Sequence, residues 1–216
     1  MHKPQRMHYA LLGLAVASVS PSSVIAKYAS GKIPDFAIGA DSAGDAGALV
    51  ISFYRLLFAT LMIAPWGLPA VLRERAAFDA RRVGFLAFVG LLLAAHFATW
   101  VESLSYTSVA SSAVLVTTEA IWVPLGAAFL LREKVGVRVW AGVAIAFGGS
   151  LLLIYGDAGP AQAGSNPVLG DFLALAGAFA ASLYFLAGRN VRQHVSLGAY
   201  AFVVYGFSTL FLFVFV

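Results

Sequence analysis

The chain has 216 residues, of which 61% are hydrophobic and only 11% are charged, and it contains no cysteine. This apolar share is far above the roughly 45–50% of a soluble domain, so the composition predicts a membrane protein. The absence of cysteine excludes disulfide bonds and thiolate metal sites. The net charge of +4 does not indicate nucleic-acid binding, because the basic residues lie in short loops between apolar blocks.

Seven apolar blocks follow one another along the chain, each near the ~20 residues that cross a bilayer as a helix. They run from Met7 to Ala29, Ala48 to Leu72, Val83 to Tyr106, Val109 to Leu131, Val137 to Tyr155, Val168 to Gly188 and Leu197 to Val216. The first block exceeds the roughly 7–15 apolar residues of a signal peptide, so we expect it to remain as a helix. The sequence therefore predicts an all-α polytopic membrane protein.

Two longer polar segments interrupt these blocks. Residues 31–47 form a long loop, and residues 156–167, GDAGPAQAGSNP, combine turn formers with no hydrophobic period. The second segment predicts a linker between two units. The first unit covers residues 7–155, and residues 168–216 are the start of the second. The chain ends inside the apolar run FLFVFV, with no polar residue to anchor a helix at the interface, which predicts that the parent protein continues beyond Val216.

The positions of Lys and Arg predict the orientation, because these residues are retained on the cytoplasmic side of short loops. With the N-terminus inside, the inner segments carry Lys3, Arg6, Arg73, Arg75, Arg81, Arg82, Arg132, Lys134, Arg138, Arg189 and Arg192. The outer segments carry only Lys27 and Lys32. We therefore expect a cytoplasmic N-terminus.

Glu119 is a carboxylate in the middle of an apolar block. It lies about ten residues from the start, which at ~1.5 Å per residue is ~15 Å deep and close to the bilayer midplane. A charge at that depth costs roughly 2.5–3.5 kcal/mol on the insertion scale, so it should face the bundle interior or a wet cavity, or be protonated. Its helical face also carries Ser112, Leu115 or Val116, and Trp122.

Two interpretations of Glu119 are open. Intramembrane ionisable groups commonly act on a substrate, a proton or a gate. Alternatively, Arg55 lies about seven residues into the second block at a similar depth, and a buried ion pair with Glu119 would satisfy both charges without any transport role. Pro124 has no N–H for the carbonyl of Ala120, which predicts a helix kink near Ala120 beside the carboxylate.

Other polar residues give weaker signals. One helical face carries a polar stripe that consists of His96, Thr99 or Trp100, Ser103 and Thr107. Two interpretations of His96 are open: the stripe lines a cavity, or a neutral His96 forms a hydrogen bond with a neighbouring helix. Glu102 lies near the outer end of its helix, where it can reach the headgroups, and it is a secondary candidate for the substrate or proton pathway. Asp171 is predicted to stabilise the N-terminus of the sixth helix. Small residues predict close helix packing at Gly142, Ala146 and Gly149, and at Gly170, Ala174, Gly177 and Ala181.

The motifs of common enzymes do not occur. The sequence has no HExxH, no GxSxG, no P-loop and no His/Asp/Glu cluster with metal spacing, so nothing indicates a cofactor or a metal. An intramembrane enzyme would require a second catalytic group within ~3 Å of Glu119 or His96.

Residues 96–155 resemble the EamA-type repeat of the drug/metabolite transporter superfamily. The similar elements are the run SLSYTSVASSAVL, a short loop of the LxEKV kind at 131–135, and WAGVAIAFGGSLLL; FYRLLFA at 53–59 and GDFLALAGAFAASLYFLAGRN at 170–190 resemble further helices of such repeats. The resemblance implies two inverted five-helix repeats, ten helices in all, of which about seven are present here. The family commonly has a proline directly after the position of Glu119, whereas here Ala120 follows and the proline is Pro124.

The resemblance implies a bacterial inner-membrane carrier that moves a small metabolite or amphiphile outward by alternating access. It also implies that proton movement can drive this export. Glu119 would line the central cavity with Arg55, His96, Trp100 and Trp122 as neighbours. The partners are then the lipid bilayer and a small solute whose identity the sequence does not specify. Alternatives are a non-transporting membrane scaffold, or a half-carrier that assembles with a partner such as a second copy of the chain.

Overall fold

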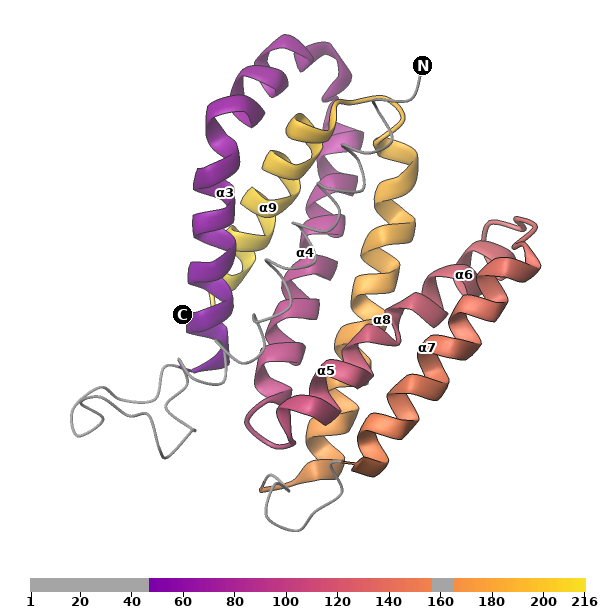
Figure 1. Ribbon diagram of the computed structural model, residues 1–216. Helices are drawn as coiled ribbons and strands as arrows, with labels where there is room; N and C mark the ends of the chain where they lie inside the picture. Colours follow the sequence, from indigo (N-terminus) through magenta and orange to yellow (C-terminus); the bar gives the residue numbers. More distant parts are fainter. Residues whose placement is uncertain (1–46, 157–164) are drawn as a thin grey trace, which may run out of the picture.

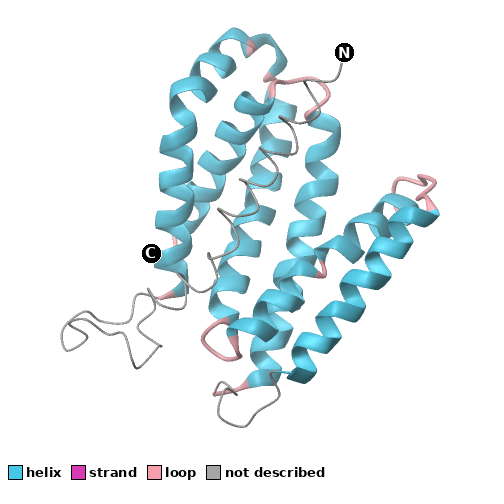
Figure 2. Ribbon diagram, viewed as in Figure 1, coloured by secondary structure: helices cyan, strands magenta, loops and turns pink. Residues whose placement is uncertain are grey.

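In the computed structural model of the chain, residues 47–156 and 165–216 are described. The predicted first helix at 7–29, all but the last residue of the loop 31–47 and most of the linker 156–167 lie outside these residues. The described elements are α3 (Ala48–Arg73), the 3-10 turn η2 (Arg75–Ala77), α4 (Ala80–Ser103), α5 (Val109–Thr117), α6 (Glu119–Phe129), α7 (Val137–Gly156), α8 (Pro167–Val191) and α9 (Leu197–Phe213). Figure 2 shows only helices and connecting loops in this part of the chain.

The helix bounds match the predicted spans to within a few residues. Within the described residues, four segments are long and apolar enough to cross a membrane, namely α3, α4, α5 together with α6, and α8. Helix α9 is an apolar helix of 17 residues. The described chain is therefore a multi-pass helical membrane protein, as the composition predicts.

Polar side chains begin four of the helices. The N-cap residues accept a hydrogen bond from a backbone N–H three residues later, and they are Asp79, Ser108, Asn166 and Ser196. The prediction that Asp171 stabilises the N-terminus of α8 is wrong, because Asn166 caps that helix and Asp171 lies beyond its first turn. The Asp171 carboxylate is directed instead toward hydroxyl groups of the preceding helices.

The fourth predicted span is broken at Thr118 into α5 and α6. The hydroxyl groups of Thr117 and Thr118 donate to the carbonyls three residues before them, at 2.7 and 2.6 Å, and such bonds bend helices by competing with the backbone ladder. A kink predicted near Ala120 from Pro124 alone is thus displaced toward the N-terminus. Glu119 becomes the first residue of α6.

Helix α4 packs against α3, α8 and α9, and α3 packs against α9 (Figure 1). Helices α5 and α6 pack against α8, and α7 packs against α5 and α6. The packing of α9 on α4 is close, since the Ser208 hydroxyl donates to the carbonyl of Gly90 at 2.7 Å and Gly90 leaves no room for a Cβ against α9. A buried apolar cluster fills the space between these helices; it includes Leu56, Leu86, Val89, Leu93 and Val204. The helices after the linker thus pack directly against those before it.

The predicted small-residue faces have different surroundings. On α8 the four residues Gly170, Ala174, Gly177 and Ala181 are all buried. A Cβ on Gly170 would lie 2.6 Å from the Cβ of Thr107, and one on Gly177 would lie 3.1 Å from the Thr99 hydroxyl. On α7, by contrast, Gly142 and Gly149 have no described atom within 4 Å of such a Cβ.

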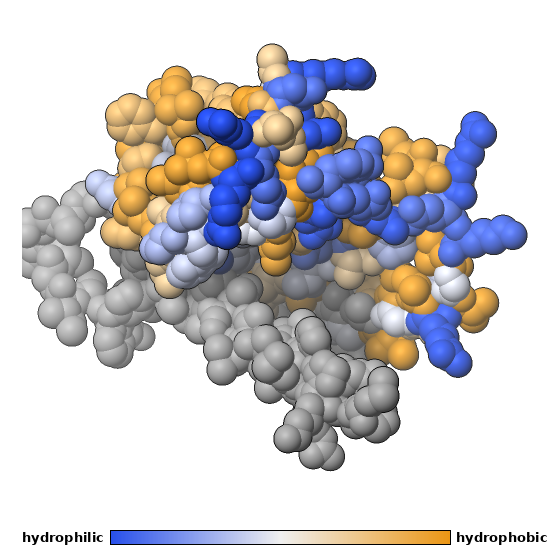
Figure 3. Space-filling view, turned by 90° about the horizontal axis from the view of Figure 1, so that it is seen from above, coloured by the Kyte–Doolittle hydropathy of each residue, from blue (hydrophilic) through white to orange (hydrophobic). Residues whose placement is uncertain are grey.

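Hydrophilic side chains gather over one end of the molecule (Figure 3). This end holds the turn between α3 and α4, the loop between α6 and α7, and the turn between α8 and α9 (Figure 1). Of the basic residues in the described part of the chain, only Arg55 lies elsewhere; the others are Arg73, Arg75, Arg81, Arg82, Arg132, Lys134, Arg138, Arg189 and Arg192. The arrangement of the helices therefore brings the loops predicted to be cytoplasmic to one common face.

Candidate functional site

Glu119 stands at the break between α5 and α6, halfway along the 109–129 segment. Its backbone carbonyl accepts a hydrogen bond from the hydroxyl of Ser182 on α8, with 3.4 Å between the oxygens. Ser182 is almost fully buried and also donates to the carbonyl of Ala178 at 2.8 Å. This hydrogen bond holds the backbone of Glu119 against α8, and it does not involve the Glu119 side chain.

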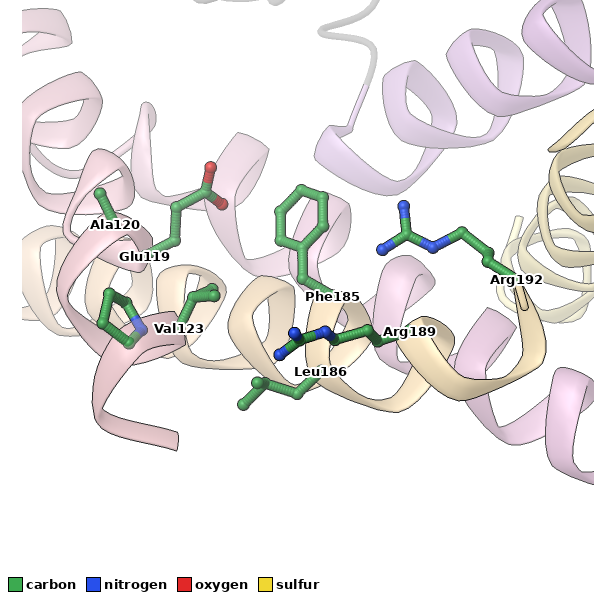
Figure 4. Close-up of a pocket in the computed structure, with 8 residues that line it drawn as sticks. Glu119, Ala120, Val123, Phe185, Leu186, Arg189 and Arg192 are labelled. Atoms are coloured by element: carbon green, nitrogen blue, oxygen red, sulfur yellow. The ribbon is translucent and has the colours of Figure 1, made fainter. Parts of the chain in front are cut away.

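The side chain of Glu119 lines a cavity of about 420 Å³ between α6 and α8. The other lining residues are Ala120, Val123, Pro124, Phe185, Leu186, Arg189 and Arg192 (Figure 4). Within the described residues, the carboxylate has no hydrogen bond and no ion pair. The cavity thus combines a half-buried, unpaired carboxylate with apolar walls, which is the composition of a small-molecule site.

Two arginines near the end of α8 line the same cavity. Arg189 forms an ion pair with Glu133 in the loop after α6, at 2.6 Å, and both side chains are about half exposed. The guanidinium of Arg192 lies 5.8 Å from the ring centroid of Tyr200 on α9. Figure 4 shows the phenyl ring of Phe185 between the Glu119 carboxylate and the Arg192 guanidinium. The cavity therefore runs from the Glu119 carboxylate toward the charged end of the molecule.

Trp122 and Ser112 share the helical face of Glu119 but lie outside the set of residues that line the cavity. Trp122 packs edge-on against Phe179 of α8, with ring centroids 5.9 Å apart. Ser112 is fully buried and shares a hydrogen bond of 2.6 Å with the hydroxyl of Ser103 on α4. In this structure both residues hold helices together.

Arg55 does not pair with Glu119. Its guanidinium lies over two rings of α4, 4.9 Å from the centroid of Phe97 and 5.2 Å from that of Trp100. His96 stacks on Trp100 with centroids 5.9 Å apart. The structure therefore divides the predicted neighbours into two groups: Arg55 of α3 lies against the aromatic rings of α4 beside Trp100 and His96, and Glu119 lies between α6 and α8.

The polar stripe of α4 faces its neighbouring helices. His96 Nδ1 lies 2.9 Å from the carbonyl of Gly177 on α8, so this nitrogen carries the hydrogen and donates it. Thr99 and Ser103 donate to carbonyls of their own helix. The alternative in which His96 bonds a neighbouring helix is the one that the structure shows. Glu102, one residue before the end of α4, is partly exposed.

Asp171 joins three segments at the end opposite to the charged face. Its Oδ1 accepts hydrogen bonds from the hydroxyls of Thr107 and Ser111, each at 2.8 Å. The backbone of Asn166 donates to the carbonyl of Tyr106 at 3.2 Å in the same region. These bonds and the close contact of Gly170 with Thr107 hold the start of α8 against the turn between α4 and α5.

Sequence reasoning did not identify Phe185, Arg189 and Arg192 as residues of the Glu119 cavity. Arg189 and Arg192 follow an apolar helix and so indicate only a cytoplasmic boundary. A spacing of three to four residues places Phe185, Arg189 and Arg192 near one face of α8, but it does not reveal that this face meets α6.

The observations define a class of protein, a multi-pass helical membrane protein with a cavity lined by a carboxylate halfway along one of its membrane-spanning segments. Residues 8–155 match the model of the EamA-like transporter family, and the chain belongs to this family.

Two curated relatives carry transporter names. One, named "Uncharacterized transporter" from Archaeoglobus fulgidus, is 27% identical over 167 residues, which are 75% of this chain and 55% of that protein. The other, named "Uncharacterized transporter YetK" from Bacillus subtilis, is 24% identical over 209 residues, which are 97% of this chain and 59% of that protein. The chain thus spans less than two thirds of the length of these relatives. No solved structure matches the chain.

Proposed function

We propose that the chain belongs to a secondary transporter that exports a small metabolite or amphiphile by alternating access, with Glu119 as the group that binds a cation or exchanges a proton. The observation that carries this proposal is the carboxylate of Glu119, unpaired among the described residues, halfway along the apolar segment 109–129 and on the wall of a 420 Å³ cavity. The family and the names of the relatives support the transporter class.

The position of the cavity supports a state of the transport cycle in which the cavity is directed to one side of the membrane. The cavity extends toward Arg189 and Arg192 at the charged end, whereas Asp171 and its hydroxyl partners hold the helices together at the other end. The positive-inside rule assigns the charged face to the cytoplasm. We interpret this arrangement as a cavity directed to the cytoplasm, in a bacterial inner membrane with a cytoplasmic N-terminus.

A carboxylate suits proton coupling because low-dielectric surroundings disfavour its ionised form and water restores it. Glu119 would then bind a proton or a cationic group while the cavity is open to water on one side of the membrane. It would release the proton or cation when the cavity opens to the other side. A full alternating cycle requires a second repeat to move against the first, and we propose that α8 and α9 begin that repeat in the inverted sense.

The test is Glu119→Gln in proteoliposomes that carry the protein, with radiolabelled solutes to follow transport and an internal pH dye to follow protons. We expect Glu119→Gln to abolish solute-driven proton flux while the folded yield stays near normal, because glutamine keeps the shape and removes the titratable group. The matched control is Glu102→Gln, which should leave the flux unchanged.

Unchanged flux in Glu119→Gln would overturn the role of this residue. Loss of folded protein in that variant would instead favour a structural role. The alternative of an intramembrane enzyme would need a second catalytic group bonded to Glu119 or His96; among the described residues the Glu119 carboxylate forms no hydrogen bond or ion pair, and His96 is bonded to a backbone carbonyl.

A further inference from the structure

Arg55 and Trp100 present hydrogen-bond donors in a second region, between α3 and α4, and the described residues supply no hydrogen-bond acceptor for them. The indole Nε1 of Trp100 is buried and has no hydrogen-bond partner among the described residues. Trp100 as a whole is only 6% exposed. Buried indole N–H groups usually find a partner, so this donor requires an explanation.

The guanidinium of Arg55 is the second donor group. It is half-buried, and it lies over the rings of Phe97 and Trp100 with no carboxylate against it in the part of the chain that the structure describes. The Tyr205 hydroxyl on α9 lies close enough to interact with it electrostatically. A cation inside a membrane is expensive unless it is paired, and aromatic faces supply only part of that pairing.

The two donors are close enough to serve one anion. The guanidinium carbon lies 5.2 Å from the ring centroid of Trp100, whose indole also carries Nε1. Two ordinary N–H···O distances of about 2.9 Å allow the two oxygens of one carboxylate to bridge such a gap. A planar guanidinium also matches a carboxylate better than it matches a single-atom anion.

We propose that Arg55 and Trp100 form an anion-binding subsite that takes the carboxylate of a small, partly apolar solute. The rings of Phe97 and Trp100, with His96 stacked on the latter, provide an aromatic wall for the apolar part of the ligand. The inference rests on the proposed function only in naming carboxylates as the class of solute that the carrier moves.

The subsite can be tested by binding alone, with the full chain in lipid nanodiscs and 4-fluorophenylacetate as the probe. The matched neutral probe is 4-fluorophenylacetamide. The chain has 4 tryptophans, so the indole N–H signals report the place of binding, and the fluorine signal reports the bound fraction. Trp66, which is 59% exposed, serves as the internal reference.

We expect a saturable shift of the Trp100 indole signal with the carboxylate and none with the amide. Arg55→Gln should abolish it, and Arg55→Lys should retain weaker binding because an ammonium keeps the charge but not the bidentate geometry. Trp100→Phe keeps an aromatic ring and removes the donor, and it should weaken binding of the fluorine probe about tenfold or more, as expected for a hydrogen bond to a charged group.

A Trp100 signal that does not respond, equal binding of the amide, or unchanged binding in Arg55→Gln would each overturn the inference. Unchanged signals of the other tryptophans show that a variant is folded. Since the measurement involves no transport step, a protein that binds the carboxylate but transports nothing would count against the proposed function and leave the subsite standing.

Discussion

Glu74, in the turn after α3, accepts a hydrogen bond from the backbone N–H of Ser196, with 2.8 Å between the nitrogen and Oε2. Ser196 is the N-cap residue of α9, so one carboxylate connects the end of α3 to the start of α9. Hydrogen bonds from Ser196 stabilise the ionised form and lower the pKa of Glu74 below its ordinary value of 4.5. A single exposed residue therefore adds a pH-dependent contact at the charged face.

This contact gives a prediction about acid. Because the folded-state pKa is lowered, the contact stabilises the fold at pH values above 4.5 and is lost as the pH falls through the folded-state pKa. We expect protection of the Ser196 amide against hydrogen exchange, corrected for the intrinsic rate, to decline below that pH. Glu74→Gln should remove the dependence, whereas an unchanged acid profile in that variant would refute this account. The Ala199 amide, which bonds the Ser196 hydroxyl, is the control.

At the scale of helices, the glycines of α8 and α7 differ in what surrounds them. A Cβ on Gly170 would lie 2.7 Å from the backbone nitrogen of Thr107, which a side-chain rotation cannot relieve. A Cβ on Gly142 would meet no described atom within 4 Å. The same residue type thus allows a close helix contact in one helix and occupies an open helix face in the other.

The two glycines give a matched pair of variants. Gly170→Ala should destabilise the protein by about 1–3 kcal/mol, the usual range for overpacking, by forcing α8 away from the turn between α4 and α5. Gly142→Ala should be neutral or stabilising by up to about 1 kcal/mol, because alanine is the better helix former. Thermal unfolding in lipid or detergent followed by circular dichroism measures both. Equal midpoints for the two variants would show that the Gly170 contact contributes little to stability.

At the scale of the whole molecule, the charged face makes the two ends of the helix bundle chemically different. The loops that carry the basic residues come together at one end, and the turn between α4 and α5 and the start of α8 lie at the other. The Glu119 cavity and the Asp171 contacts lie toward opposite ends. The orientation in the membrane therefore decides to which side the proposed cavity is directed.

The chain has no cysteine, so single cysteines can report this orientation without background. We expect Ser165→Cys, in an exposed position opposite to the charged face, to react with a membrane-impermeant maleimide in intact cells. Gly136→Cys, exposed in the loop between α6 and α7, should react only after permeabilisation. The reverse pattern would place the charged face outside and direct the cavity away from the cytoplasm.

Much of the fold was predictable because hydrophobic length and Lys/Arg positions act locally along the chain. The bounds of the described spans, such as Ala48 to Leu72, and the place of Glu119 halfway along its apolar segment follow from residue spacing alone. The break at Thr118 was displaced from its predicted place because hydroxyl bonds from Thr117 and Thr118 act in addition to the effect of Pro124.

The sequence by itself determined the membrane class, the order of the helices along the chain, the common face of the basic loops in the described residues and the presence of a carboxylate halfway along an apolar segment. Only the tertiary structure decided which side chains meet. It separates Arg55 from Glu119 and places Arg189 and Arg192 on the Glu119 cavity. The physical reason is that helical periodicity specifies which residues share a face, whereas the partner of each face depends on helix packing between segments far apart in the sequence.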